Sequence, residues 1–316
     1  MNVIFKPKAL RRLLSIFFVC AIIAANGQIA HAEEPLFGTK TTLDPRALGL
    51  AGALRALPSS TSGIYLNPAT LAMANLYHMN MMYQFTSKEN LHTGGLAIAD
   101  SVTSSTFAAG LSLNYLGANQ DTTHHESWDG RLALAGNFGD VFFAGMTCRY
   151  IRVANDVEPD DLGPGNMHPA LPSSGSLQLN GFTFDAGAAL KLGDMLSIGI
   201  TGYNLSNTNS VYAPLKLGGG IGTTLFEMLL IEADLVVDFS SHNELSQEID
   251  LGAEIFLAGL VPVRIGYIFD TYYQMNSIAA GIGYTDTAFA LDVGFQYEIR
   301  NNGRFFLAFG LRIFLS

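Results

Sequence analysis

The C-terminal residues 304–316 alternate between two kinds of side chain. Large apolar side chains occupy every second position from 305 to 315, and the positions between them are mostly small or polar and include Arg312. Successive side chains of a β-strand point to opposite faces, so this segment predicts a strand with one wholly apolar face. Its length matches the roughly 9–11 residues that a tilted strand needs to cross a membrane.

Similar segments recur back to Tyr77 and predict fourteen strands. The links between them alternate in length: those at one end are all very short, and the other end has every long one. This asymmetry is typical of bacterial outer-membrane barrels, whose periplasmic turns are short and whose external loops are longer. The predicted strands are 77–87, 92–100, 105–116, 130–138, 141–152, 180–192, 195–205, 215–225, 228–239, 247–257, 261–270, 275–285, 287–299 and 303–315.

A soluble β-sandwich or solenoid is the alternative for an alternating pattern. Strands in such proteins average about 5–6 residues, whereas these run to about ten or more. The pattern therefore favours an all-β fold, a transmembrane antiparallel β-barrel of about 14 strands with its C-terminus in the periplasm.

Residues 33–75 break the alternation, because they are rich in small residues and contain four prolines, among them Pro45, Pro58 and Pro68. An irregular segment cannot face lipid, where its backbone polar groups would stay unpaired. We therefore expect it to fold as a hatch inside the barrel or at its periplasmic mouth. Within it, Asn67-Pro68 favours a turn or a helix start, and the hydroxyls of residues 59–62 offer N-cap oxygens for a short helix.

The first 32 residues have the features of a secretory signal. Basic residues lie between positions 6 and 12, an apolar run covers 13–25, and Ala30-His31-Ala32 forms an A-x-A cleavage site. A lipoprotein site at Cys20 is disfavoured because small residues do not precede it. The predicted organisation is a signal peptide over 1–32, the hatch over 33–75 and the barrel over 76–316, with export to the outer membrane.

Cleavage would leave 13 basic and 27 acidic residues, and 13 minus 27 gives a net charge of −14. Nucleic acid is not an expected partner, because phosphate binding requires clustered Lys and Arg. Only Cys148 would remain, which excludes a disulfide framework and a cysteine zinc site within one chain. Cys148 shares one face of its predicted strand with Met146 and Tyr150, so we expect it to face lipid as an inert apolar side chain.

Charged residues recur at positions that the alternation turns away from lipid. An Arg or Lys on the lipid face costs about 2–4 kcal/mol at the membrane midplane, so we expect these residues in the lumen. There they would solvate the interior and fasten the hatch. A sharper hypothesis pairs the hatch residues Arg46 and Arg55 with the acidic wall residues Glu232, Asp234 and Glu254. The expected lumen positions are Asp185, Lys191, Lys216, Glu232, Asp234, Asp250, Glu254, Arg264, Asp292 and Arg312.

Catalytic and metal sites have little support in the sequence. No G-x-S-x-G motif or comparable nucleophile motif occurs, so we expect no enzyme, although Ser, His and Asp are all present. The pair His124-His125 is interpreted as part of a solvated loop, because neighbouring strand positions point to opposite faces. Segment 155–161 holds four acidic residues but lacks the spacing and central Gly of an EF-hand. No metal or other cofactor is expected.

Segment 45–72 resembles the N-terminal signature of the FadL-type outer-membrane barrels and their PorV/PorQ-like relatives, specifically in residues 46–53 and 65–69. In that family the N-terminal segment plugs the lumen and carries an Asn-Pro-Ala motif, which corresponds here to Asn67, Pro68 and Ala69. Together with Arg46 and Arg55, these three residues are the candidate gating residues of the hatch.

The resemblance implies a monomeric barrel in outer-membrane lipid that passively takes up small hydrophobic compounds. Relatives carry long-chain fatty acids or aromatic hydrocarbons and are thought to release them sideways at a kinked early strand. This chain is shorter than typical fatty-acid transporters, and most of its predicted external loops are short. A PorV/PorQ-like barrel that binds secreted or surface proteins without conducting a ligand is therefore the alternative.

Overall fold

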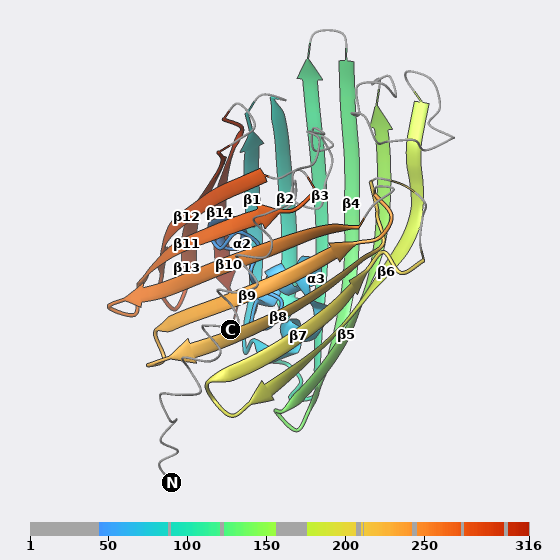
Figure 1. Ribbon diagram of the computed structural model, residues 1–316. Coiled ribbons are helices and arrows are strands. Elements are labelled where there is room, and N and C mark those ends of the chain that lie inside the picture. Colours follow the sequence, from blue (N-terminus) through green and yellow to red (C-terminus); the bar gives the residue numbers. More distant parts are fainter. Residues whose placement is uncertain are drawn as a thin grey trace.

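The structure is a computed structural model that describes residues 44–87, 90–120, 123–155, 176–206, 210, 212–241, 245–272, 275–299 and 303–315. Fourteen antiparallel strands form a closed barrel in which each strand pairs with its neighbours in sequence and β1 pairs with β14 (Figure 1). The predicted all-β barrel of 14 strands is confirmed. The signal peptide predicted over 1–32 lies outside the described residues. None of the helices described is long and apolar enough to span a membrane.

The elements follow one another along the chain with short turns at one end of the barrel. The hatch holds α2 Pro45–Gly49, η2 Ser60–Ser62, α3 Gly63–Leu66 and η3 Pro68–Met73. The strands are β1 Tyr77–Thr86, β2 Leu91–Asp100, β3 Phe107–Gln120, β4 Thr123–Phe138, β5 Phe142–Asn155, β6 Ser176–Leu192, β7 Leu196–Tyr203, β8 Lys216–Leu225, β9 Leu229–Asp238, β10 Ser246–Leu257, β11 Val261–Asp270, β12 Met275–Thr285, β13 Phe289–Glu298 and β14 Phe305–Phe314.

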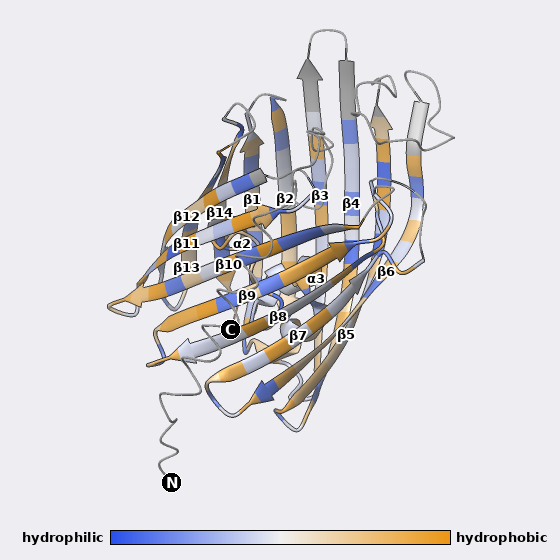
Figure 2. Cartoon of the chain, viewed as in Figure 1, coloured by the Kyte–Doolittle hydropathy of each residue, from blue (hydrophilic) through white to orange (hydrophobic). Residues whose placement is uncertain are grey.

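The outer face of the barrel carries an apolar band bordered by aromatic side chains. On β3, Phe107 is 68% exposed near the short turns, and Tyr115 is exposed eight positions further along. Eight residues of a strand tilted by about 45° rise roughly 19 Å, which is close to the roughly 25 Å apolar band of membrane barrels. Figure 2 shows hydrophobic and hydrophilic residues interleaved along the strands. Aromatic pairs eight or ten positions apart recur at Trp128 and Phe138, Phe142 and Tyr150, and Phe289 and Tyr297.

Strands β3 to β6 continue beyond this band, and the polarity of the wall reverses there, as β5 shows. On β5 the outward positions change from Tyr150 to the charged Arg152, while the inward positions change from the buried Arg149 to the buried Ile151 and Val153. Figure 1 shows β3 and β4 extending past the ends of β1 and β2. This part of the wall is polar outside and apolar inside, as in a water-soluble sheet.

The reversal explains the main errors in the predicted strand limits. Residues 117–129 were expected as an external loop, but β3 extends to Gln120 and β4 begins at Thr123. Likewise β5 reaches Asn155 and β6 starts at Ser176 inside the expected loop 153–179. The predicted strands end where outward-facing side chains stop being apolar. The backbone pairing continues beyond these positions.

The described part of the hatch, residues 44–75, lies against the inner wall. Helix α2 contacts β11 to β14, and η3 contacts β3 to β6. The Asp44 side chain accepts a hydrogen bond from the Ala47 amide at 2.8 Å and caps α2. Asn67 caps η3 in the same way and Pro68 occupies the first turn, so the helix start predicted at Asn67-Pro68 is confirmed.

The predicted capping by residues 59–62 is wrong. Neither η2 nor α3 has a side-chain cap, because these hydroxyls bond to more distant groups. Ser59 bonds to Thr70, Ser62 donates to Asp44, and Ser60 lies 3.3 Å from a ring nitrogen of His78. The hydroxyls thus fasten the hatch to itself and to β1.

Glycines on the wall allow the hatch backbone to approach closely. A Cβ atom at Gly199 would overlap the carbonyl oxygen of Arg55, and one at Gly145 would overlap the backbone of Pro68. Gly294 stands in the same relation to Pro45. The glycine content of these strands therefore reflects direct contact between two backbones.

Adding one methyl group to this contact should loosen the hatch. We expect Gly199→Ala to lower the free energy of unfolding by about 1–3 kcal/mol, as overpacking does, and to speed proteolysis of the hatch. Gly94→Ala is the matched control, because a Cβ atom there meets no atom within 4 Å. Urea unfolding in lipid vesicles measures both variants, and equal stability of the two would contradict the contact.

Candidate functional site

One end of the hatch joins the barrel through an alternating chain of five charges. Arg46 contacts Glu254 on β10 at 2.9 Å, and Glu254 contacts Arg264 on β11 at 2.7 Å. Arg264 reaches Asp292 on β13 at 2.6 Å, and Asp292 contacts Arg312 on β14 at 2.7 Å. Alternating signs let each buried charge meet an opposite charge, which is the condition for burying ions without a large penalty.

The middle of the hatch binds two carboxylates through four consecutive backbone amides. The amides of Leu54 and Arg55 each donate to Asp234 at 3.2 Å. Those of Ala56 and Leu57 donate to Glu232, the latter at 3.1 Å. Charge-assisted bonds of this kind are stronger than neutral ones. We call Glu232, Asp234 and these four amides the seat of the hatch. The seat holds residues 54–57, which belong to no helix or strand.

The Arg55 side chain completes the seat. Its Nη1 lies 2.8 Å from Asp234 and 3.0 Å from Asp250, and its Nε donates to the Tyr203 hydroxyl at 2.8 Å. Burial opposes the charge on Arg55, but Tyr203, Asp234 and Asp250 outweigh that effect and raise its pKa well above the usual value. Arg55 therefore stays protonated in the closed lumen.

The Asn-Pro-Ala residues connect this seat to the opposite wall. Asn67 is completely buried, and its Nδ2 donates to the Arg55 carbonyl at 2.6 Å and to the Ala188 carbonyl at 3.3 Å. Pro68 lies against Gly145, and Ala69 packs with the wall residue Phe143. The motif therefore fills the gap between the hatch and β5 and β6.

A second ionic cluster forms a floor above the hatch. Asp129 accepts from Arg131 at 2.8 Å and pairs with Arg149 at 2.7 Å, and Arg131 lies 3.7 Å from Asp185. The Arg131 guanidinium stacks over the Tyr65 ring of the hatch at 4.8 Å. Burial raises the pKa of Tyr65 to about 12, so its hydroxyl stays neutral.

Of this floor, the sequence interpretation identified only Asp185. Asp129 fell in a segment assigned to an external loop, and Arg131 and Arg149 were not recognised as inward-facing. The alternation around them held the signal: Arg131 precedes the outward Leu132 on β4, and Arg149 follows the outward Cys148 on β5. Cys148 lies on the outer face, partly exposed.

Above the floor, the inner face of the tall wall holds an apolar cluster. Its buried members are Leu91 on β2, Leu116 on β3, Ile151 and Val153 on β5, and Tyr212 from the link before β8. Along the barrel axis, starting from the end with the short turns, the lumen thus holds the ion-paired hatch, then the ionic floor and then the apolar cluster.

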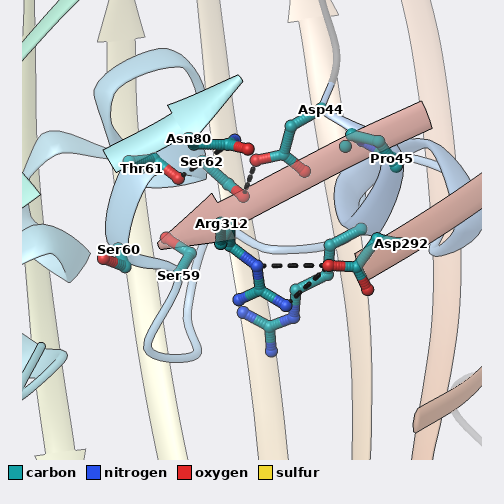
Figure 3. A pocket seen from close by; sticks show the side chains of 11 residues that line it. Asp44, Pro45, Ser59, Ser60, Thr61, Ser62, Asn80, Asp292 and Arg312 are labelled. Carbon is teal, nitrogen blue, oxygen red and sulfur yellow. Dashed lines mark hydrogen bonds and ion pairs between the residues drawn. The ribbon is translucent and has the colours of Figure 1, made fainter. Parts of the chain in front are cut away.

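A small polar cavity lies between the hatch and the wall near β14. Its lining includes Arg46, Arg312, Asn80 and the hydroxyl-bearing residues 59–62 (Figure 3). The figure shows Arg312 and Asp292 paired at its edge, and Asp44 bonded to Ser62. The cavity is lined by charged and hydroxyl groups, so it does not suit a hydrophobic ligand.

The other predicted positions are more peripheral. Lys216 pairs with Asp238 at 3.1 Å. Lys191 lies at the mouth of the barrel, 42% exposed, and is 3.8 Å from the exposed Asp194. His124 and His125 belong to β4 rather than to a loop. Over the described ranges, no cluster of three or more His, Cys, Asp or Glu is placed to hold a metal ion.

Comparison with solved structures identifies the fold. The CymD monoaromatic hydrocarbon channel aligns with a TM-score of 0.69 at 12% identity, covering 89% of this chain and 99% of that one. The Ralstonia pickettii toluene transporter TbuX gives 0.67 at 13% identity, covering 87% and 98%. A Pseudomonas aeruginosa FadL homologue gives 0.60 at 13%, covering 86% and 97%. The chain has the FadL-type barrel fold. No family model matches the chain, and neither does any curated protein sequence.

In this FadL-type barrel, Arg55 is the cation on which the seat depends. We expect Arg55→Met to lower the free energy of unfolding by about 3–5 kcal/mol, because it leaves buried carboxylates uncompensated. Lys191→Met is the matched control: its exposed ion pair contributes about 0–1 kcal/mol. Urea unfolding followed by tyrosine and tryptophan fluorescence measures both, and a loss below 1 kcal/mol for Arg55→Met would contradict the assigned role.

Proposed function

We propose that this protein is an outer-membrane channel for passive uptake of small hydrophobic compounds, gated by the hatch. The observation that carries the proposal is the apolar cluster directly above the ionic floor. The fold agrees with it, since the CymD and TbuX structures are described as a hydrocarbon channel and a toluene transporter. We also propose a cleaved signal peptide over 1–32 and a monomer surrounded by lipid.

The apolar cluster provides a reason for a hydrophobic compound to leave water. Burial of apolar surface stabilises by about 25 cal/mol per Å², so a molecule that replaces part of the contacts among Leu116, Ile151 and Val153 gains free energy. The outer face at the same height is polar, so the apolar side chains of this part of the wall gather in the lumen, where an entering compound meets them. The cluster is thus the entry site in this proposal.

The floor and hatch then act as the gate. Moving the whole hatch would break the pairs of Arg46 and Arg55, at about 3–5 kcal/mol for each buried pair. A local shift is cheaper, and the segment around Asn67, Pro68 and Ala69 lies below the floor, against β5 and β6. We infer that gating involves this segment while the Arg55 seat stays closed.

The alternative function is a non-conducting barrel that binds secreted or surface proteins. The specific observation in its favour is the lumen, in which paired charges and backbone contacts fill the space between hatch and wall. The tall wall of β3 to β6 would offer a binding surface outside the membrane.

Polar substitutions in the entry site test the transport proposal. We expect Ile151→Asn combined with Val153→Asn to reduce toluene uptake into proteoliposomes about tenfold or more, because two buried apolar side chains contribute about 1.5–3 kcal/mol each. Arg152→Gln lies between them but faces outward, so it should leave uptake unchanged. Equal uptake by all three proteins would contradict an entry site here.

Removal of residues 35–75 tests gating. If the hatch closes the lumen, the shortened barrel should conduct ions in a planar bilayer, whereas the intact protein should not. The shift in electrophoretic mobility on heating shows whether the shortened barrel has folded. Equal and negligible toluene uptake by both folded proteins would remove the transport proposal and favour the interaction barrel.

A further inference from the structure

Two buried glutamines lie on either side of β14 in the inner wall. Gln84 on β1 stands opposite Ala308, and Gln296 on β13 stands opposite Phe306. Thr86 on β1 also stands opposite Phe306, from the other side. The pairing register therefore places two amides and one hydroxyl around a single apolar side chain.

Among the described residues, the side-chain polar atoms of Gln84, Thr86 and Gln296 have no hydrogen-bond partner. Both Gln84 and Gln296 are 1% exposed, and neither Oε1 nor Nε2 of either residue has a hydrogen-bond partner among the residues described. The buried Thr86 hydroxyl has none either. An unsatisfied buried polar group costs about 1–3 kcal/mol. Three such residues in one patch are therefore a considerable cost, unless something else bonds to them.

Apolar surfaces lie on two sides of the group. Phe306 and Ala308 belong to the same buried cluster as Leu48 of the hatch. In the opposite direction Thr86 pairs with Leu91, a member of the apolar cluster of the proposed entry site. The amides thus lie between the hatch and the entry site, where a compound leaving that site would meet them.

The nearest charges are already engaged. Arg304 stacks over Phe306 at 5.7 Å, and its Nε donates to Glu298 at 2.7 Å. The amides themselves carry no net charge, so they cannot neutralise a carboxylate or an ammonium group in a buried place. A pure hydrocarbon would leave all of these amide atoms unsatisfied.

We propose that Gln84, Thr86 and Gln296 form a binding site for the neutral hydrogen-bonding group of a small, otherwise apolar compound, such as an alcohol, a phenol or a ketone. The Gln amides can donate through Nε2 and accept through Oε1, and Phe306 contacts the apolar part. The inference rests on the proposed function and narrows its substrate class, from hydrophobic compounds in general to those with one uncharged polar group.

Benzyl alcohol and toluene, which differ by one hydroxyl, are the matched probes. The test variant is Gln84→Met combined with Gln296→Met, which keeps the side-chain length and removes the amides. The control is Gln247→Met, since Gln247 is exposed on β10 and takes no part in the site. Uptake of both compounds is measured in proteoliposomes, and thermal unfolding is measured with and without benzyl alcohol.

We expect the double variant to lose about tenfold in benzyl alcohol uptake, because one or two hydrogen bonds of about 1 kcal/mol are removed. Toluene uptake should be unchanged or higher. Without a ligand the double variant should melt at a higher temperature than wild type, because its buried amides are gone. Benzyl alcohol should raise the melting temperature of wild type and of Gln247→Met, but not that of the double variant.

Other outcomes overturn the inference. If benzyl alcohol and toluene uptake fall equally, or neither changes, the amides do not select a polar group. If benzyl alcohol shifts the melting temperature of all three proteins alike, the amides do not bind its hydroxyl group. Failure of the proposed function would give a different result, namely no uptake of toluene by the wild-type protein. The melting experiment would still test the site in that case.

Discussion

The structure depends on one constraint: an irregular segment inside a barrel must find hydrogen-bond partners on the barrel wall. The hatch has little regular structure, so helices and strands satisfy few of its backbone groups. Glu232 and Asp234 supply such partners, because their carboxylates accept hydrogen bonds from four consecutive hatch amides. Arg55 in turn balances part of their charge. The acidic residues of the lumen therefore belong to the fold of the hatch as much as to the solvation of the barrel.

The same constraint explains the composition of the strands. Where hatch backbone meets wall backbone, only glycine fits, as at Gly145, Gly199 and Gly294. The Gly-rich strand β8 follows this rule as well: Gly218 faces the Arg55 side chain, and Gly220 makes room for the carboxylates on β9. A strand with few side chains looks like a weak barrel segment, but here it is the wall of the hatch seat.

Much of the fold could be predicted from the sequence, because alternation and turn length are local signals. The strand limits failed at β4, because its outward positions change from Trp128 to the charged Glu126 while the backbone pairing continues, and Asp129 was missed with them. The helix start at Asn67-Pro68 was predictable because proline restricts the backbone of its own turn. The partner of Ser60 was not, because His78 lies on another element and only the folded chain brings the two together.

The reversal of polarity along β3 to β6 relates the fold to the proposed transport. A strand that crosses the membrane puts apolar side chains outward, and the same strand above the membrane must put them inward or expose them to water. Above the aromatic border, the wall therefore gains an apolar inner face as a consequence of its height. Because the floor of Arg131 and Arg149 stays ion-paired just below, a hydrophobic compound would be attracted into the wall and stopped at that level. The position of the membrane boundary along these four strands thus determines both where such a compound would bind and where the hatch must open.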